Sequence, residues 1–191
     1  MNFEYQMNPI EVIQKYYPVE SAAYRILVRH SRDVANRALQ IGRAHPEWEL
    51  DLQFVEEAAM LHDIGAFLCH APQIGCFGDA MYICHGFLGA DLLREEGYPR
   101  HALVCERHTG AGITVEMIDR HNLPIPRRDM CPKSMEEQLI CFADKFYSKT
   151  RPDTEMAIEM IRISMARYGE ASVLQFDKWC EMFSPQVKTG G

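Results

Sequence analysis

The sequence predicts an all-α fold, built as a single helical bundle. Apolar residues recur at three- and four-residue intervals over most of the chain, which is the spacing of amphipathic helices. Nowhere do four to eight residues alternate between polar and apolar as a half-buried strand would. A chain of 191 residues with 47% hydrophobic content is long enough for one sizeable core but short for two ordinary domains. We therefore treat residues 1–191 as one domain.

The first three helices are predicted from their caps and their apolar periodicity. Asn8 begins a helix over residues 9–18, because an amide cap followed by a proline and an early glutamate is typical of a helix start. Apolar positions over residues 21–42 predict a long amphipathic helix. Asp51 caps the third helix, which we expect to end near residue 65 at a glycine.

The middle of the chain alternates between helical and irregular segments. Prolines and glycines interrupt residues 66–80, which predicts a loop that lines or covers a site. Helical periodicity resumes over residues 81–96 and 100–108. Residues 110–132 are irregular, with one turn of helix at residues 115–120.

The last third of the chain is predicted to hold three more helices. Ser134 and Glu137 form a capping-box pattern, which opens the helix that carries Asp144. Residues 153–168 and 171–183 show the periodicity of two further amphipathic helices. Their aromatic and methionine positions fit either core packing or a subunit contact, so a homodimer stays an open alternative.

Composition narrows the classes of partner and location. A net charge of −7 argues against a long nucleic acid, since binding such a polymer usually needs a basic face. No stretch approaches the roughly 18 apolar residues of a membrane span, and residues 1–18 resemble neither a secretory signal nor a membrane anchor. Seven cysteines without a CxxC pair predict free thiols in a reducing, cytoplasmic location.

Six residues with metal-binding side chains are predicted to lie at helix ends or on helix faces. They are His30, His62, Asp63, His85, His108 and Asp144. Imidazole and carboxylate together suit manganese, iron, cobalt or zinc, whereas a magnesium site is normally built from oxygen ligands. Neighbouring helical residues point about 100° apart, so the adjacent pair His62-Asp63 reaches one metal only near a helix end. Six ligands are enough for a binuclear site.

Five stretches around these residues resemble the HD phosphohydrolase superfamily, particularly its branch named for the run His-Asp-Ile-Gly. They are His30-Ser31-Arg32-Asp33-Val34-Ala35, Leu61-His62-Asp63-Ile64-Gly65, His85-Gly86-Phe87-Leu88-Gly89-Ala90, Arg107-His108-Thr109-Gly110 and Phe142-Ala143-Asp144-Lys145. The stretches occur in the family's order. The resemblance covers residues 22–150 and would leave residues 151–191 as a helical extension.

The resemblance implies an HD-type bundle with its metal site between the helices. The positions that match His30, His62, Asp63 and Asp144 bind the metal in mononuclear members. Binuclear members add the positions that match His85 and His108, and the position of Asp63 bridges the two ions. The implied cofactors are two divalent transition-metal ions. Iron or manganese is favoured, and cobalt, nickel and zinc are the alternatives.

One departure from the resemblance concerns the residue after the run His-Asp-Ile-Gly. The branch often has a lysine there, whereas this chain has Ala66. We expect Lys145 and Arg107, each adjacent to a predicted ligand, to supply a phosphate contact or to stabilise developing charge in its place. Residues 107–112 also resemble the branch that includes dinucleoside polyphosphate hydrolases.

The remaining histidines are alternatives to the predicted ligands. His101 precedes His108 by two helical turns and could share its helix face. The Thr-Gly sequence after His108 favours His108 as the ligand. Isolated histidines are more often surface or core residues than ligands, and we expect this of the others. These are His45, His70 and His121.

The expected function is hydrolysis of a small phosphorylated metabolite, a nucleotide or dinucleotide, by attack of metal-bound hydroxide. Two divalent ions would outweigh the charges of Asp63 and Asp144, so that an otherwise acidic protein attracts a phosphate. Two alternatives stay open. The same ligands would serve a diiron oxygenase, and a nucleotide-binding sensor would keep the pocket without turnover.

Overall fold

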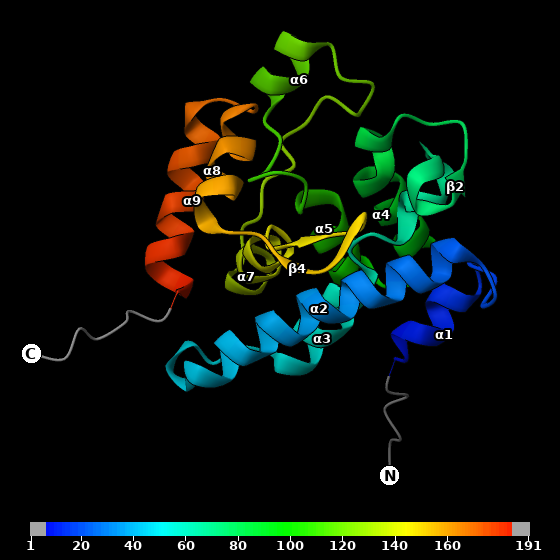
Figure 1. The fold of residues 1–191 in the computed structure, drawn as a ribbon, viewed down its shortest axis with the longest axis horizontal. Coiled ribbons are helices and arrows are strands. Elements are labelled where there is room, and N and C mark those ends of the chain that lie inside the picture. Colours follow the sequence, from blue (N-terminus) through cyan, green and yellow to red (C-terminus); the bar gives the residue numbers. More distant parts are fainter. Residues whose placement is uncertain (1–6, 185–191) are drawn as a thin grey trace, which may run out of the picture.

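The computed structural model describes residues 7–184, and it is predominantly helical (Figure 1). The α-helices are α1 (Pro9–Gln14), α2 (Ala22–Ala44), α3 (Leu52–Leu61), α4 (His85–Glu95), α5 (Pro99–Arg107), α6 (Val115–His121), α7 (Met135–Asp144), α8 (Ile158–Ala166) and α9 (Glu170–Phe183). The predicted all-α class is therefore confirmed. Short 3₁₀ turns, including Ile64–Leu68 and Tyr82–Cys84, join several of these helices.

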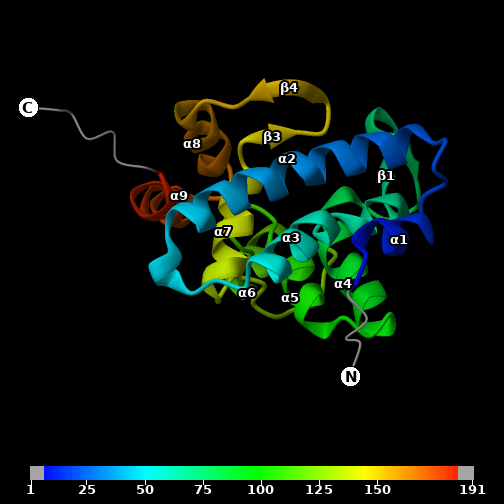
Figure 2. The same ribbon diagram turned by 90° about the horizontal axis from the view of Figure 1, so that it is seen from below.

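The main core lies where α2, α3 and α7 pack together (Figures 1 and 2). The long helix α2 is amphipathic and buries one face against its neighbours, as its apolar periodicity predicts. Helix α7 is more deeply enclosed, and its run from Leu139 to Ala143 has no exposed side chain. A helix that is apolar on all sides is stable only inside a core, so α7 lies at the centre of the bundle.

Helix starts agree with the predicted caps. The side-chain oxygens of Asn8, Asp51 and Ser134 each accept a hydrogen bond from a backbone N–H in the first turn of the helix that follows. Glu137 does not complete the capping box, because its carboxylate accepts from the backbone of Lys133 instead of that of Ser134.

Two predicted helix ends were placed too late. The first helix ends at Gln14, and α3 ends at Leu61, before the glycine that we expected to stop it. The imidazole of His62 explains the second difference. Its Nδ1 lies 2.6 Å from the carbonyl oxygen of Ala59, which the N–H of Asp63 would need to extend the helix. His62 and Asp63 therefore follow α3 instead of lying in its last turn.

The prediction of a helix over residues 153–168 was wrong at its start. Residues Arg151–Glu155 form the strand β4, which pairs antiparallel with β3 (Tyr147–Ser148), and the helix begins only at Ile158. The strand pairing depends on a partner earlier in the chain, which local periodicity does not reveal. The extension after residue 150 thus begins with a strand and continues as α8 and α9.

The predicted loop over residues 66–80 contains a second small hairpin. Strand β1 (His70–Ala71) pairs antiparallel with β2 (Cys76–Phe77), with a 3₁₀ turn between them. Both hairpins are short, so the strand content stays minor beside the helices (Figure 2).

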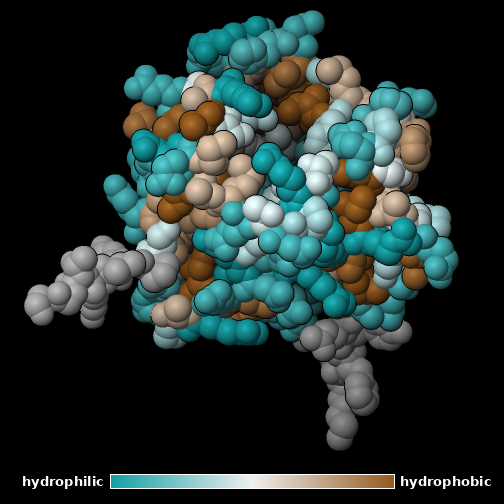
Figure 3. All heavy atoms as spheres, viewed as in Figure 1, coloured by the Kyte–Doolittle hydropathy of each residue, from teal (hydrophilic) through white to brown (hydrophobic). Residues whose placement is uncertain are grey.

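The described residues bear on the predictions about membrane spans and free cysteines. Hydrophilic side chains cover much of the face in Figure 3, with apolar side chains in separate islands. No helix within residues 7–184 has the length and apolar character needed to cross a bilayer. All seven cysteines lie in this range as free thiols, and five of them are buried. The predicted features of residues 1–18 fall partly outside the described residues.

Candidate metal centre

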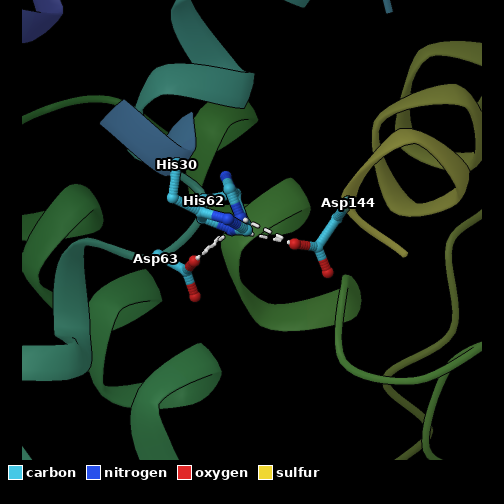
Figure 4. A group of neighbouring side chains, drawn as sticks. All are labelled: His30, His62, Asp63 and Asp144. Atoms are coloured by element: carbon cyan, nitrogen blue, oxygen red, sulfur yellow. Dashed lines mark ion pairs between the residues drawn. The ribbon is translucent and has the colours of Figure 1, made fainter. Parts of the chain in front are cut away.

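The six predicted ligands converge on one place inside the bundle, from five helices. The six residues form two groups that share Asp63. The first holds His30, His62, Asp63 and Asp144, and the second holds Asp63, His85 and His108. Within each group the candidate ligand atoms lie within 4.8 Å of one another, which is close enough to surround one ion. Figure 4 shows the imidazoles of the first group pointing between the two carboxylates.

Asp63 presents a different oxygen to each group. Its Oδ2 lies 3.1 Å from Nε2 of His30 and 2.9 Å from Nε2 of His62. Its Oδ1 lies 3.2 Å from Nε2 of His85 and 3.4 Å from Nε2 of His108. The carboxylate is fully buried. This arrangement suits the bridging position that the sequence resemblance implied.

Asp144 completes the first group from the opposite side. Its Oδ1 lies 3.0 Å from Nε2 of His30 and 3.4 Å from Nε2 of His62. It ends helix α7, whose burial fixes the direction from which the carboxylate approaches. The first group therefore offers two imidazoles and two carboxylates.

Three of the histidines are oriented by the same local contact. The Nδ1 atom of each lies near the carbonyl oxygen three residues earlier, at 2.6 Å for His62, 2.6 Å for His85 and 2.7 Å for His108. A carbonyl oxygen accepts only, so Nδ1 of each ring carries a hydrogen, and Nε2 is the atom left to bind a metal. Backbone contacts of this kind fix the orientation of metal-binding histidines. All three Nε2 atoms are directed toward the centre.

Several buried atoms at the centre form no contact with the geometry of a hydrogen bond, although most of them lie within ion-pair distance of another candidate ligand atom. They are both ring nitrogens of His30, Nε2 of His62 and both carboxylate oxygens of Asp63. Buried polar atoms are normally satisfied, so a cluster of such atoms needs an explanation. The Nε2 atoms of His85 and His108 also face each other at 3.0 Å, close to the separation of two nitrogens bound about 2.0–2.1 Å from one ion. These residues fit a divalent transition metal.

Charge keeps the carboxylates of the centre ionised. Burial alone would raise the pKa of Asp63, but the charges of His62 and Lys149 hold it well below its ordinary value. Burial would likewise lower the pKa of His62, yet Asp63 and Asp144 raise it to about 9. Burial lowers the pKa of His108 to about 4. His108 is thus predisposed to be neutral, which is the form in which an imidazole binds a metal.

Lys149 belongs to the centre, and the sequence prediction missed it. Its Nζ lies 2.5 Å from Oδ2 of Asp63, and only 15% of its side chain is exposed. The lysine lies in the turn between β3 and β4, so its position depends on a hairpin that was not predicted. The sole sequence signal was its place shortly after Asp144. Burial would lower its pKa, but Asp63, Tyr82 and Asp144 raise it above the ordinary value.

The two residues predicted to replace the missing lysine differ in their surroundings. Nζ of Lys145 lies 2.7 Å from Oδ2 of Asp144 and 3.0 Å from the carbonyl oxygen of His108, next to the centre. Arg107 instead donates from Nη1 to both carboxylate oxygens of Glu137, at 3.0 and 2.9 Å. A catalytic role for either residue stays a prediction, and these contacts favour Lys145.

His101, the alternative to His108, lies in neither ligand group. Its Nε2 is 3.1 Å from a carboxylate oxygen of Glu57, and its ring packs edge-on against Phe54. His45 lies at the surface, stacked on Trp48. His70 and His121 are exposed, and none of these four histidines belongs to either ligand group.

A cavity of about 330 Å³ opens beside the centre. Asp144, Lys145 and Lys149 form its charged side, and Met165 and Tyr168 contribute an apolar wall from the segment around α8. The predicted lining loop also reaches it, through Gln73 and Ile74. A ligand here would meet both cationic groups and apolar side chains.

Comparison with known proteins shows which family the chain matches. The sequence pattern of the HD domain family matches residues 27–148, which include all six candidate ligands. Lys149, α8 and α9 lie beyond the match.

Curated proteins of archaea show further similarity. The chain is 34% identical to an uncharacterized protein of Methanocaldococcus jannaschii over 128 residues, which is 65% of this chain and 68% of that protein. It is 31% identical to a tRNA (cytidine(56)-2'-O)-methyltransferase of Picrophilus torridus over 72% of this chain and 38% of the enzyme. The similarly named enzyme of Thermoplasma volcanium is 29% identical over 73% and 35%. The match thus spans little more than a third of each methyltransferase. No solved structure matches the chain significantly.

Proposed function

Because this chain belongs to the HD domain family, we propose that it is a metal-dependent phosphohydrolase that acts on a small phosphorylated substrate of the nucleotide class. One observation carries the proposal. Two groups of metal-binding side chains share Asp63, and Asp144 of the first group lines a cavity that two lysines also line. Family membership supports a hydrolase-type function with a metal, and the cavity supports an anionic substrate.

The first group would hold one divalent ion and the second group another, with Asp63 between them. Such ions supply an activated water and neutralise oxygens of a phosphoryl group. The residues of the chain orient that chemistry. The backbone contacts of His62, His85 and His108 fix the ring orientations before any ion binds, so little reorganisation is needed.

The cavity supports a substrate about the size of one nucleotide. Its volume of about 330 Å³ lies near the lower end of the roughly 300–1,000 Å³ typical of small-molecule sites. Lys145 and Lys149 place positive charge near the metal ligands, where a phosphate would lie. Met165 and Tyr168 also line the cavity and offer apolar surface, which suits the face of a nucleobase. These dimensions favour a mononucleotide over a dinucleotide.

Methyl transfer to tRNA is not proposed for this chain. The two methyltransferases contain a matching stretch in little more than a third of their length, so their activity does not by itself belong to that stretch. The net charge of −7 also disfavours a long polyanion as the substrate.

A substrate screen with metal reconstitution tests the proposed function. Purified protein is depleted of metal, supplied separately with Mn²⁺, Co²⁺, Ni²⁺ or Fe²⁺, and assayed for phosphate release from mononucleotides, dinucleotides and simple phosphoesters. Asp63→Asn should lower kcat on the order of 10³-fold or more, because it removes charge from the shared ligand. His45→Ala, a surface change, is the control and should leave turnover unaltered. Substrate oxidation that consumes oxygen only with iron, without phosphate release, would contradict the proposal.

A further inference from the structure

Lys149 occupies an unusual place for a lysine. It lies just beyond the HD match, and its ammonium group sits inside the protein at 2.5 Å from Oδ2 of Asp63. The hairpin holds the residue there. Nη2 of Arg29 donates to the carbonyl oxygen of Lys149, and Oγ of Ser148 accepts from the backbone N–H of Thr150 within the turn. The inward direction of the side chain therefore follows from the hairpin geometry.

Two cavities meet at this side chain. Lys149 lines the open cavity beside Asp144, and it also lines a second, small space of about 10 Å³ together with Ala66. That space is about the minimum for a single water molecule. The small side chain of Ala66 thus leaves room that Lys149 occupies from another part of the chain. The open cavity gives the ammonium group a second direction in which to turn.

Each of the two carboxylates in the first ligand group contacts one lysine. Lys149 contacts Asp63, and Lys145 contacts Asp144. A buried carboxylate without a cation is costly, so these lysines stabilise the centre when no metal is bound. An ion in the first group needs the same Oδ2 atom of Asp63 that Lys149 contacts. Lys149 and that ion therefore compete for one oxygen.

We propose that Lys149 exchanges partners: it neutralises Asp63 in the metal-free protein, and in the metal-bound protein it turns into the open cavity and binds the substrate phosphate. The inference rests on the proposed function, because it takes the anion in that cavity to be a phosphate group. It follows that metal and phosphate each strengthen binding of the other, since metal binding releases the lysine that the phosphate uses.

Replacing Lys149 should then change the two affinities in opposite directions. In Lys149→Met the competing charge is gone, so Mn²⁺ should bind the first group at least about tenfold more tightly. Inorganic phosphate should bind the Mn²⁺-saturated variant at least about tenfold more weakly, because a charge-assisted contact is lost. If Lys149 were purely structural, its replacement would weaken the binding of both Mn²⁺ and phosphate, or of neither.

The experiment uses the full chain and two binding measurements. Isothermal titration calorimetry measures Mn²⁺ binding to metal-depleted protein and inorganic phosphate binding to Mn²⁺-saturated protein. Lys178→Met is the matched control, because Lys178 is exposed on α9, and it should bind both ligands as wild type does. Lys149→Arg keeps the charge and should recover most of the phosphate affinity.

If Lys149→Met bound both ligands more weakly, or bound both as wild type does, the inference would be overturned. If Lys149→Met does not fold, the linkage is measured in the wild-type protein, where saturating phosphate should tighten Mn²⁺ binding; independence of the two ligands would overturn the inference equally. The proposed function fails on a different observation, the absence of phosphate release by the metal-loaded wild-type protein from every compound of the substrate screen.

Discussion

At the scale of single residues, the contrast between His62 and Lys149 shows what the sequence can predict. His62 and its neighbour Asp63 were identifiable because a local run of residues marks them, and the ring is fixed by a carbonyl only three residues away. Lys149 carries no such mark. Its contact with Asp63 joins residues far apart in the chain and depends on the turn of a short hairpin. Local patterns therefore identified the candidate ligands but missed a charged residue beside them.

His108 is the residue that decides between one ion and two. Its Nε2 lies in the second ligand group only, so His108→Gln should leave the first group intact while the second loses a nitrogen. We expect Mn²⁺ stoichiometry to fall from about two per chain in the wild type toward one in the variant. Elemental analysis after dialysis against Mn²⁺ measures it. His101→Gln is the control, because that ring contacts Glu57 instead. A wild-type stoichiometry of one would remove the second group from metal binding.

Arg107 should prove more important for stability than for turnover. Its side chain is 16% exposed and donates to both oxygens of Glu137, so Arg107→Ala leaves a largely buried carboxylate without its cation. We expect a loss of roughly 2–4 kcal/mol in the free energy of unfolding, measured by urea denaturation. The folded variant should keep the wild-type kcat. A fall in kcat of about 10²-fold or more with unchanged stability would instead support the catalytic role predicted from sequence.

At the scale of helices and strands, the helix starts marked by capping residues were predictable, whereas the start of α8 and two helix ends were not. A cap such as Ser134 acts on a backbone N–H three residues away, so a short window of sequence contains both partners. The end of α3 depends on a side chain that occupies a backbone carbonyl, and β4 depends on pairing with β3. The apolar pattern alone reveals neither a side chain that occupies a backbone carbonyl nor the partner of a strand.

The contact between the turn after α3 and helix α4 makes Gly65 a second determinant of the site. A Cβ atom at Gly65 would overlap the carbonyl oxygen of His85 and the backbone of Gly89. Backbone atoms cannot move aside as a flexible side chain does, so Gly65→Ala must push α4 away and displace His85 from Asp63. We expect a loss of at least about 2 kcal/mol in the free energy of unfolding.

The same variant should also bind less metal at the second group. Thermal denaturation and Mn²⁺ titration of Gly65→Ala measure the two effects. Gly97→Ala provides the comparison, because a Cβ there meets no atom within 4 Å, although its positive φ of 86° adds a smaller backbone strain. Wild-type metal binding by Gly65→Ala would show that the close approach of α4 is not what positions His85.

Across the whole molecule, the segment after residue 150 joins the core and the cavity. Phe176 of α9 stacks on Phe142 of α7, two residues before the candidate ligand Asp144. Met165 of α8 lines the cavity that Asp144 also lines. The sequence predicted the helices of this extension without assigning them a role, because the surfaces that they cover belong to distant residues. The organisation of the chain as one domain stays a prediction.

A single domain predicts that the extension and the metal centre unfold together, and Trp179 is the residue with which to test it. Its side chain is fully buried, and its Nε1 donates to Oε1 of Gln138 on α7 at 3.0 Å. Trp179→Ala should lower the free energy of unfolding by about 3–5 kcal/mol, as removal of a large buried aromatic side chain typically does. Loss of helical circular dichroism and release of Mn²⁺ to a chelating dye should shift to lower temperature by the same amount. Leu174→Ala, on the exposed side of α9, should change the free energy of unfolding by less than about 0.5 kcal/mol. Metal release that stays at the wild-type temperature, while part of the helical signal is lost earlier, would mean that α8 and α9 form a separate unit. In a single domain, a core that loses the contact between Phe142 and Phe176 would also lose the position of Asp144, so the two signals would shift together.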